Sequence, residues 1–232
     1  MIIRSFARVV TPPFLLLLLL LAVTCQENQN QEFINSCGDI HNITFPFQLK
    51  GDPSHDAYDH NFILSCDENN RTVLNLLSEK YYVQSISYTN FSIRLVDVGF
   101  QTSDICSSFP LSSLIPADFI DVVVPYYVNI DPVTVTFLSC ENPLIQSPAY
   151  INRTGYCTTG DGSGNGYYSY VVVGEVTLWD FPDSCLMDKV ASSSSPRLIS
   201  GQGFLNLSWL DLNRELAYGF EASWNLVGKY SE

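Results

Sequence analysis

The residues best suited to metal chemistry lie in one short stretch, from His55 to His60. It holds His55, Asp56, Asp59 and His60, and imidazole and carboxylate groups are suitable ligands for a divalent metal ion. The two histidines are five residues apart in a predicted loop, a spacing that matches no strong metal-binding motif. The sequence therefore predicts a solvated loop here, and we expect neither a metal nor a cofactor.

A second stretch, Asp161–Gly166, has the spacing of the first half of an EF-hand calcium loop. Asp161, Ser163 and Asn165 stand at alternate positions, and a glycine follows at the sixth. The twelfth position is Val172, where a bidentate glutamate is required, and strand-like rather than helical sequence flanks the loop. We interpret this stretch as a glycine-rich hairpin connection rather than a calcium site.

The sequence holds no recognisable catalytic motif. It lacks the Gly-x-Ser-x-Gly turn of serine hydrolases, and a Ser-His-Asp triad would have to use a histidine that lies in no recognisable context. A pair of carboxylates for glycoside hydrolysis stays open, because such pairs meet in space rather than along the chain. Residue types and spacing thus give no positive indication of an enzyme.

The N-terminus has the features of a secretory signal peptide. Arg4 and Arg8 precede a leucine-rich apolar run, Phe14–Ala22, which is too short for a membrane-spanning helix and is followed by small and polar residues. We expect residues 1–25 to be removed on export. Cleavage after Cys25 would leave an even number of cysteines, which suits three disulfides whose pairing the sequence leaves open. These cysteines are Cys37, Cys66, Cys106, Cys140, Cys157 and Cys185.

Five Asn-x-Ser/Thr sequons agree with export, because each is a candidate N-glycosylation site on the solvent face. They stand at Asn42, Asn70, Asn90, Asn152 and Asn206. The chain is strongly acidic, with 24 Asp and Glu against 11 Lys and Arg and a net charge of −13. Such a charge argues against nucleic acid as a partner, and it also opposes any other polyanion.

Short β-rich runs separated by turn residues dominate the chain. They are Ile43–Phe47, Phe62–Ser65, Thr72–Leu77, Tyr81–Ser87, Phe91–Val98, Val133–Phe137, Tyr167–Leu178 and Phe204–Trp209. The best helix candidate is the short Asp211–Ala217. We predict a mainly β, disulfide-stapled fold of short antiparallel strands in two lobes, residues 33–100 and 126–232, joined by a linker-like segment at 101–125.

Several motifs between Cys37 and Cys66 carry a family resemblance. Cys37-Gly38 is followed by Ile-Thr-Phe-Pro-Phe at Ile43–Phe47, by Gly-Asp-Pro at Gly51–Pro53 and by Phe-x-Leu-Ser-Cys ending at Cys66. This pattern closely resembles the galacturonan-binding domain at the N-terminus of plant wall-associated receptor kinases. Nearer relatives are the rust-resistance receptor-like kinases and the ectodomains of some membrane RING-finger proteins.

The resemblance continues through most of the remaining chain and departs from the family pattern at one place. Further matching segments are Asn69–Asp97, Ser139–Pro143, Tyr168–Val176, Asp183–Cys185 and Tyr218–Trp224. The cysteine that the family usually carries after the Gly-Asp-Pro turn is absent, since His55–Tyr58 contains none. One family disulfide is therefore expected to be lost or re-paired.

The resemblance implies a non-catalytic, extracellular domain that binds pectic galacturonan in the cell wall. Relatives are membrane-anchored, whereas this sequence has no apolar run beyond the signal peptide that could span a membrane. A uronate ligand favours Arg or Lys for its carboxylates and aromatic faces for its rings. The candidates in the best-matched region are Arg71, Lys80, Tyr81, Tyr82 and Arg94.

The sequence leaves open whether calcium takes part in binding and whether the ligand is a polysaccharide or a protein. Calcium bridging between acidic protein surface and uronate would reconcile the net charge with a pectic ligand. The alternative function is a protein-interaction ectodomain that recognises a peptide or a co-receptor, truncated from a receptor kinase or a RING-finger protein.

Overall fold

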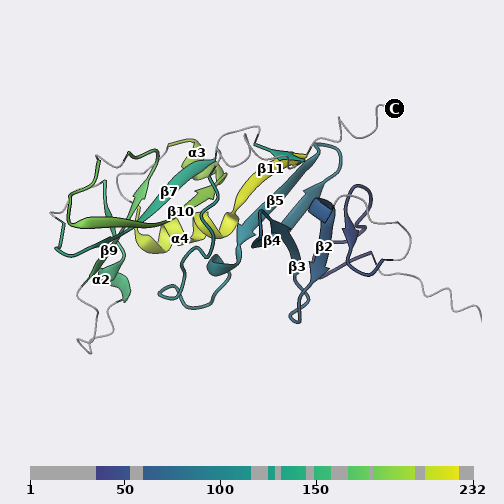
Figure 1. Ribbon diagram of the computed structural model, residues 1–232, viewed down its shortest axis with the longest axis horizontal. Coiled ribbons are helices and arrows are strands. Elements are labelled where there is room, and N and C mark those ends of the chain that lie inside the picture. The colour runs from purple at the N-terminus through teal and green to yellow at the C-terminus, as the bar shows by residue number, and fades with distance from the viewer. Residues whose placement is uncertain are drawn as a thin grey trace, which may run out of the picture. The chain divides into compact units, whose positions relative to one another are not determined.

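Two β-sheets form most of the fold in the computed structural model (Figure 1). The structure describes residues 35–52, 60–115, 125–128, 132–144, 149–157, 167–177, 180–201 and 207–224, which belong to one compact unit, Asn35–Glu232. The predicted signal peptide, the first part of the histidine-containing loop, the 161–166 loop and Asn206 lie outside these residues.

The larger sheet has seven strands in the order β1-β2-β3-β4-β5-β11-β6. Their bounds are β1 Gln48–Leu49, β2 Ile63–Cys66, β3 Thr72–Leu76, β4 Glu79–Ser87, β5 Ser92–Asp97, β11 Phe220–Trp224 and β6 Tyr126–Tyr127. Every neighbouring pair is antiparallel except β1 and β2.

The smaller sheet is antiparallel and has four strands in the order β10-β7-β9-β8. Its strands are β10 Cys185–Ser193, β7 Val133–Cys140, β9 Tyr168–Val173 and β8 Ile151–Asn152. The helices of the described part are short: α2 Thr154–Cys157, α3 Pro196–Ile199 and α4 Trp209–Tyr218, with 3₁₀ turns at His60–Phe62 and Val98–Phe100. The prediction of a mainly β fold with short, mostly antiparallel strands is confirmed.

The larger sheet draws strands from both ends of the chain. β11, near the C-terminus, lies between β5 and β6 and pairs Phe220 with Leu95 and Ala222 with Ile93 (Figure 1, where β11 is yellow). A C-terminal segment thereby completes the sheet that the N-terminal strands begin. The lobe boundaries themselves stay a prediction.

Two details of the predicted elements are wrong. Ile43–Phe47 is not a strand, because the chain turns at Phe45 and Pro46 and β1 begins only at Gln48. The β-rich run predicted for Phe204–Trp209 is also wrong in its described part, since Leu207 and Ser208 lie in no strand and Trp209 begins α4. Ser208 caps this helix: its hydroxyl accepts a hydrogen bond from the backbone N–H of Asp211 at 3.1 Å, which satisfies one of the free donors of the first turn.

All six predicted cysteines pair. The disulfides join Cys37 to Cys66, Cys106 to Cys157 and Cys140 to Cys185. The first connects the segment before β1 to the end of β2, the second anchors the 101–115 segment to α2, and the third joins β7 to β10. The expectation of three bridges is thus confirmed, and the structure supplies the pairing that the sequence left open.

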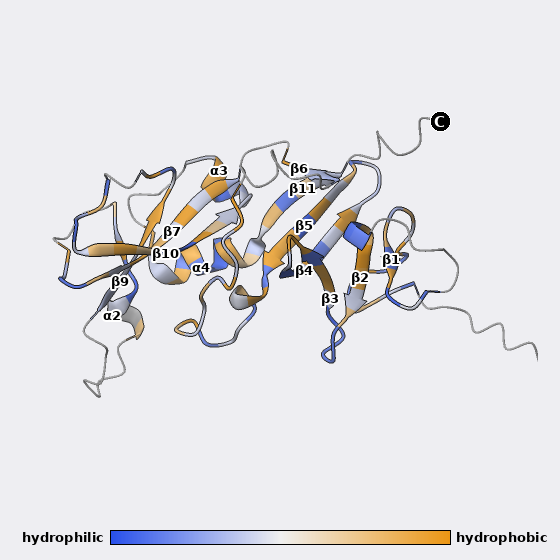
Figure 2. Cartoon of the chain, viewed as in Figure 1, coloured by the Kyte–Doolittle hydropathy of each residue, from blue (hydrophilic) through white to orange (hydrophobic). Residues whose placement is uncertain are grey.

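The hydrophobic core occupies both faces of β5. Ile93 and Leu95 are fully buried on one face, while Val96 on the other packs in a cluster with Phe137 and Trp209. The rings of Phe137 and Trp209 meet edge to face, with centroids 6.0 Å apart. Figure 2 shows this pattern as orange along the strands, with blue residues in many of the connecting turns.

A buried carboxylate holds the segment after β5. Asp97 is 7% exposed and accepts hydrogen bonds from the backbone N–H groups of Gly99 (2.7 Å), Leu111 (3.0 Å) and Ser112 (2.8 Å) and from the Ser112 hydroxyl. The Ser112 hydroxyl also lies 2.5 Å from the hydroxyl of Tyr81. The 98–112 segment is therefore fixed to the larger sheet although it contains no strand.

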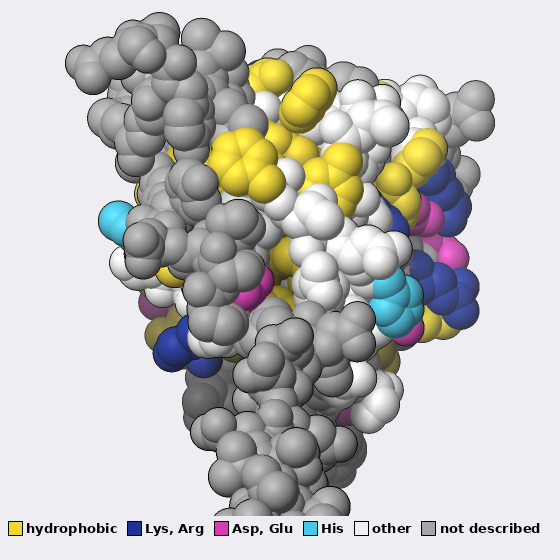
Figure 3. Space-filling model, turned by 90° about the vertical axis from the view of Figure 1, so that its right-hand side faces the viewer, with side chains coloured by type: hydrophobic (Ala, Val, Ile, Leu, Met, Phe, Trp, Pro, Cys, Tyr) yellow, Lys and Arg dark blue, Asp and Glu magenta, His cyan; other side chains and the backbone are white. Residues whose placement is uncertain are grey.

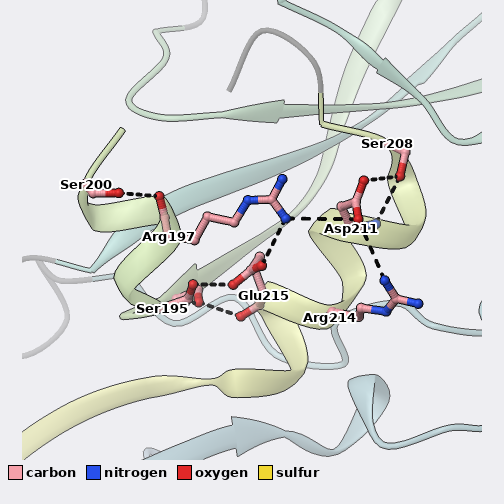
Figure 4. A network of polar contacts seen from close by, with 8 residues as sticks. Ser195, Arg197, Ser200, Ser208, Asp211, Arg214 and Glu215 are labelled. Carbon is pink, nitrogen blue, oxygen red and sulfur yellow. Dashed lines mark hydrogen bonds and ion pairs between the residues drawn. The ribbon is translucent and has the colours of Figure 1, made fainter. Parts of the chain in front are cut away.

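Polar contacts connect α3 with α4 (Figure 4). The Nη1 atom of Arg197 lies 3.5 Å from the carboxylate of Glu215 and 4.0 Å from that of Asp211. Ser195, just before α3, donates its hydroxyl hydrogen to Glu215. α4 also buries Trp209, Leu212 and Leu216, so its position is set by packing as well as by charge.

Candidate functional site

Strand geometry divides the five predicted binding residues between the two faces of the larger sheet. Side chains alternate along a strand, so Lys80 and Tyr82 share one face of β4 and Tyr81 takes the other. Tyr81 is 1% exposed, and its ring packs edge to face on Phe220 at 5.6 Å. A buried ring cannot stack on a sugar, so Tyr81 is a core residue and is left out of the site.

The other four candidates lie on the opposite face, which we call the basic face: Arg71, Lys80, Tyr82 and Arg94. Tyr82 pairs with Val96 across β4 and β5, and Arg94 lies two residues from Val96 on the same side of the sheet. Arg71, just before β3, places its guanidinium over the ring of Tyr82. β3 and β5 flank β4, so the two arginines stand about 10 Å apart across the sheet.

Arg71 is held from two sides. Its Cζ atom lies 4.1 Å from the centroid of the Tyr82 ring, a cation–π geometry. Its Nε and Nη2 atoms both contact the Asp67 carboxylate, at 2.9 and 2.8 Å, and 39% of the side chain stays exposed. Desolvation raises the pKa of the Tyr82 hydroxyl, although the Arg71 charge opposes this shift. The phenol therefore stays protonated and presents a neutral ring to the guanidinium.

The Asp67–Arg71 turn positions this arginine. One oxygen of Asp67 accepts the backbone N–H groups of Asn69 (2.9 Å) and Arg71 (2.8 Å). The turn also approaches Gly38, which has φ +56° and whose backbone N–H donates to the side chain of Asn70 at 3.1 Å. A Cβ at Gly38 would clash with the carbonyl oxygen of Asn70, so this contact requires glycine.

Replacing Asp67 by Asn is expected to lower stability at neutral pH but not in acid. Desolvation alone would raise the Asp67 pKa, but the hydrogen bonds from Arg71 and Asn69 and the Arg71 charge hold it below the ordinary 3.8. A carboxyl with a lowered folded-state pKa stabilises the fold above its ordinary pKa, and this contribution is lost as the pH falls through the folded-state value. Urea unfolding of both proteins should show a gap in the free energy of unfolding at neutral pH, and this gap should close as the pH falls below 3.8. A gap that persists unchanged in acid would contradict this account.

Arg94 is held in a similar way by a residue far along the chain. Its Cζ atom lies 4.4 Å from the centroid of the Tyr218 ring, and Nη1 donates to the backbone oxygen of Tyr218 at 3.3 Å. Its Nε donates to the hydroxyl of Ser85 at 3.5 Å. Sequence reasoning missed Tyr218; the available signal was the resemblance of Tyr218–Trp224 to the family, which says nothing of a role beside Arg94.

The basic face retains hydrogen-bond donors for a ligand. Among the residues that the structure describes, Nη1 of Arg71 and Nη2 of Arg94 have no hydrogen-bond partner. Lys80 is exposed, and its ammonium group contacts no acceptor within the same residues. Guanidinium and ammonium donors form strong charge-assisted hydrogen bonds with carboxylates. Glu221, opposite Arg94 in β11, adds one negative charge at the rim of this face.

A different surface lies at the end of the molecule around Trp224, the last residue of β11, where the rings of Phe47 and Tyr88 both pack edge to face on the indole. Figure 3 looks onto this end and shows hydrophobic side chains gathered on it. Phe91 is 54% exposed and has a positive φ of 51°, and its ring packs edge to face on buried Trp224. Phe45 is 46% exposed nearby in the chain segment whose Thr44 N–H donates to the hydroxyl of Tyr88. We call this surface the aromatic end.

The described sequons are accessible. Asn42, Asn70, Asn90 and Asn152 are all exposed. The side-chain oxygen of Asn70 accepts a hydrogen bond from the backbone N–H of Gly38. Its side-chain nitrogen, to which a glycan would be attached, takes no part in this bond. Glycosylation stays a prediction.

The structure can be searched for a metal site and for a membrane-spanning helix only in the residues that it describes. His60 is exposed in the turn before β2, and within the described ranges no three His, Cys, Asp or Glu side chains are grouped to hold a metal ion. Across these same ranges, no helix has the length and hydrophobicity needed to cross a membrane.

Comparison with known families identifies the N-terminal part of the chain. Residues 25–97 match the family described as wall-associated receptor kinase galacturonan-binding. This segment is a galacturonan-binding domain of that family. No match was found among curated proteins or among solved structures. The galacturonan-binding domain contains β1 to β5 and all four residues of the basic face, and its family implies binding of cell-wall polysaccharide and an extracellular location.

Proposed function

We propose that this protein is a secreted, N-glycosylated binding protein for pectic galacturonan, without catalytic activity. The observation that carries the proposal is the basic face, where Arg71, Lys80 and Arg94 share one side of the sheet inside the galacturonan-binding domain. Galacturonan is a polymer of uronates, so its ligand groups are carboxylates at regular intervals. Two fixed guanidinium groups and one exposed ammonium group, all with free donors, suit such a polymer.

Each arginine contributes fixed geometry as well as charge. A guanidinium stacked on a tyrosine ring loses little further freedom when it binds a carboxylate, which favours affinity. The Tyr82 ring is covered by Arg71 and supports it, so this ring acts through the arginine rather than as an open sugar platform. Lys80 adds a mobile charge that can follow the polymer.

The acidic net charge of −13 works against long-range attraction of a polyanion. Calcium offers a way around this repulsion, because it accepts oxygen ligands from both uronate and protein carboxylates. Glu221 beside Arg94 is one such carboxylate on the basic face. We therefore propose that calcium strengthens binding, with the metal carried mainly by the polysaccharide.

Calorimetry with two ligands tests the proposal. The glycosylated protein is titrated with de-esterified oligogalacturonide and with a methyl-esterified oligomer of the same length. We expect saturable binding of the first and at least about tenfold weaker binding of the second, because esterification removes the charge that the arginines recognise. A chelator should weaken the first titration. Equal binding of both ligands would show that carboxylates are not recognised.

The aromatic end favours a second candidate function, recognition of a protein partner. Exposed apolar clusters mark interaction surfaces, and Phe91 keeps a strained backbone conformation while more than half exposed. A protein that gives no heat with either oligogalacturonide, and whose partner binding is lost in Phe91→Ser, would support this candidate instead.

A further inference from the structure

We propose that Tyr218 is a positioning residue for Arg94, so that α4, outside the galacturonan-binding domain, completes the uronate site. The ligand part of this inference rests on the proposed function. The contact between Tyr218 and Arg94 is independent of any ligand.

Two different contacts fix the arginine on Tyr218. The ring lies under the guanidinium, with 4.4 Å between Cζ and the ring centroid, and the backbone carbonyl of the same residue accepts from Nη1 at 3.3 Å. A ring and a carbonyl together define both the plane and the rotation of the guanidinium. Ser85 accepts from Nε at 3.5 Å and restrains that edge of the guanidinium, while Nη2 has no hydrogen-bond partner among the described residues.

The backbone around Tyr218 is built for this approach. Gly219 follows with φ +82°, and its N–H closes α4 by donating to Leu216 at 3.0 Å. A Cβ at Gly219 would clash with the carbonyl oxygen of Leu95, so only glycine lets the end of α4 approach β5 this closely. Leu95 is the neighbour of Arg94, which explains why Tyr218 reaches the arginine.

The helix that carries Tyr218 is itself firmly placed. Trp209, Leu212 and Leu216 are buried in the core shared with the smaller sheet, and the α4 contacts of Figure 4 hold its solvent side. After Gly219 the chain enters β11, which pairs with β5. Arg94 is therefore positioned by the end of α4, at a residue 124 positions further along the chain.

The first test needs no ligand. In protein labelled with ¹⁵N-arginine, the Nε–Hε signal of Arg94, identified by its absence in Arg94→Lys, should carry an upfield ring-current shift. The shift should persist in Tyr218→Phe, which keeps the ring and the carbonyl, and disappear in Tyr218→Leu. An unshifted Arg94 signal in the unsubstituted protein overturns the inference, even if Tyr218→Leu fails to fold.

The second test measures coupling in binding. Tyr218→Leu should weaken binding of de-esterified oligogalacturonide about fivefold to tenfold, while Tyr218→Phe should bind almost normally. In the Arg94→Gln background, Tyr218→Leu should add nothing, because a residue that acts through Arg94 has no effect once Arg94 is removed. Additive losses would overturn the positioning role. If the unsubstituted protein binds no oligogalacturonide, the proposed function fails, and the arginine spectrum alone decides the role of Tyr218.

Discussion

Asp97→Ala is expected to lower the free energy of unfolding by about 3–4 kcal/mol, because it removes the acceptor shared by four donors, and both donors of Ser112 are buried. The Asp97 carboxylate accepts from three backbone N–H groups and from the Ser112 hydroxyl, which in turn contacts Tyr81. The two Ser112 donors are buried, so they lose their acceptor with no access to water. A loss of this size is a large share of the net stability of a typical domain.

Urea unfolding under non-reducing conditions measures this effect. Asp97→Asn retains one acceptor oxygen and should lie between Asp97→Ala and the unsubstituted protein. Asp183→Ala is the matched control, since Asp183 is exposed and contacts no donor among the described residues; it should change the free energy of unfolding by less than about 0.5 kcal/mol. A change below about 1 kcal/mol in Asp97→Ala would show that the network contributes little.

The strands and cysteines could be predicted because their signals are local. Phe62–Ser65, Tyr81–Ser87 and Phe91–Val98 alternate apolar with polar residues or are rich in aromatic and β-branched residues, and strands β2, β4 and β5 lie within one or two residues of these bounds. The helix at Asp211–Ala217 was also found, and it begins two residues earlier because Ser208 caps it.

The long-range parts of the fold carry no such signal. Nothing near Phe220–Trp224 shows that it pairs with β5 rather than with a strand close in sequence, and the disulfide partners depend on the same topology. The choice between Tyr81 and Tyr82 depended on which face of β4 is buried. Part of the cover over Tyr81 comes from Phe220, which lies near the other end of the chain.

The sequence indicated which residue types a uronate site would need, but not which residues hold the arginines in place. Arg71, Lys80 and Arg94 could be proposed from the sequence because a uronate requires cations and the family resemblance indicated the region; their contact with a ligand stays a prediction. The supports of the arginines were not found. Asp67 acts across a four-residue turn, and Tyr218 acts across most of the chain, so only the folded structure brings them to the guanidinium groups.

Arg71→Gln combined with Arg94→Gln is expected to raise the Kd for de-esterified oligogalacturonide at least about 100-fold. Each arginine that bonds a carboxylate contributes about 1.5–3 kcal/mol, or roughly tenfold or more in affinity. The two stand about 10 Å apart and share no partner, so their losses should be close to additive. Gln retains polar donors and most of the side-chain length, which limits structural damage.

Lys189→Gln is the control for loss of a positive charge outside the basic face. Lys189 lies on β10 in the smaller sheet, where its ammonium donates to the carbonyl oxygen of Leu111 at 2.9 Å. Its replacement removes one positive charge without touching the basic face. We expect its Kd to stay within about twofold of the unsubstituted value, because surface charges far from a bound ligand are screened by salt.

The most direct measurement is calorimetric titration of these two variants and the unsubstituted protein with de-esterified oligogalacturonide, in calcium, after thermal unfolding has shown that all three are folded. We predict saturable binding by the unsubstituted protein and by Lys189→Gln, and no measurable heat with Arg71→Gln/Arg94→Gln. Undiminished binding by the double variant would contradict the assignment of the uronate site to the basic face.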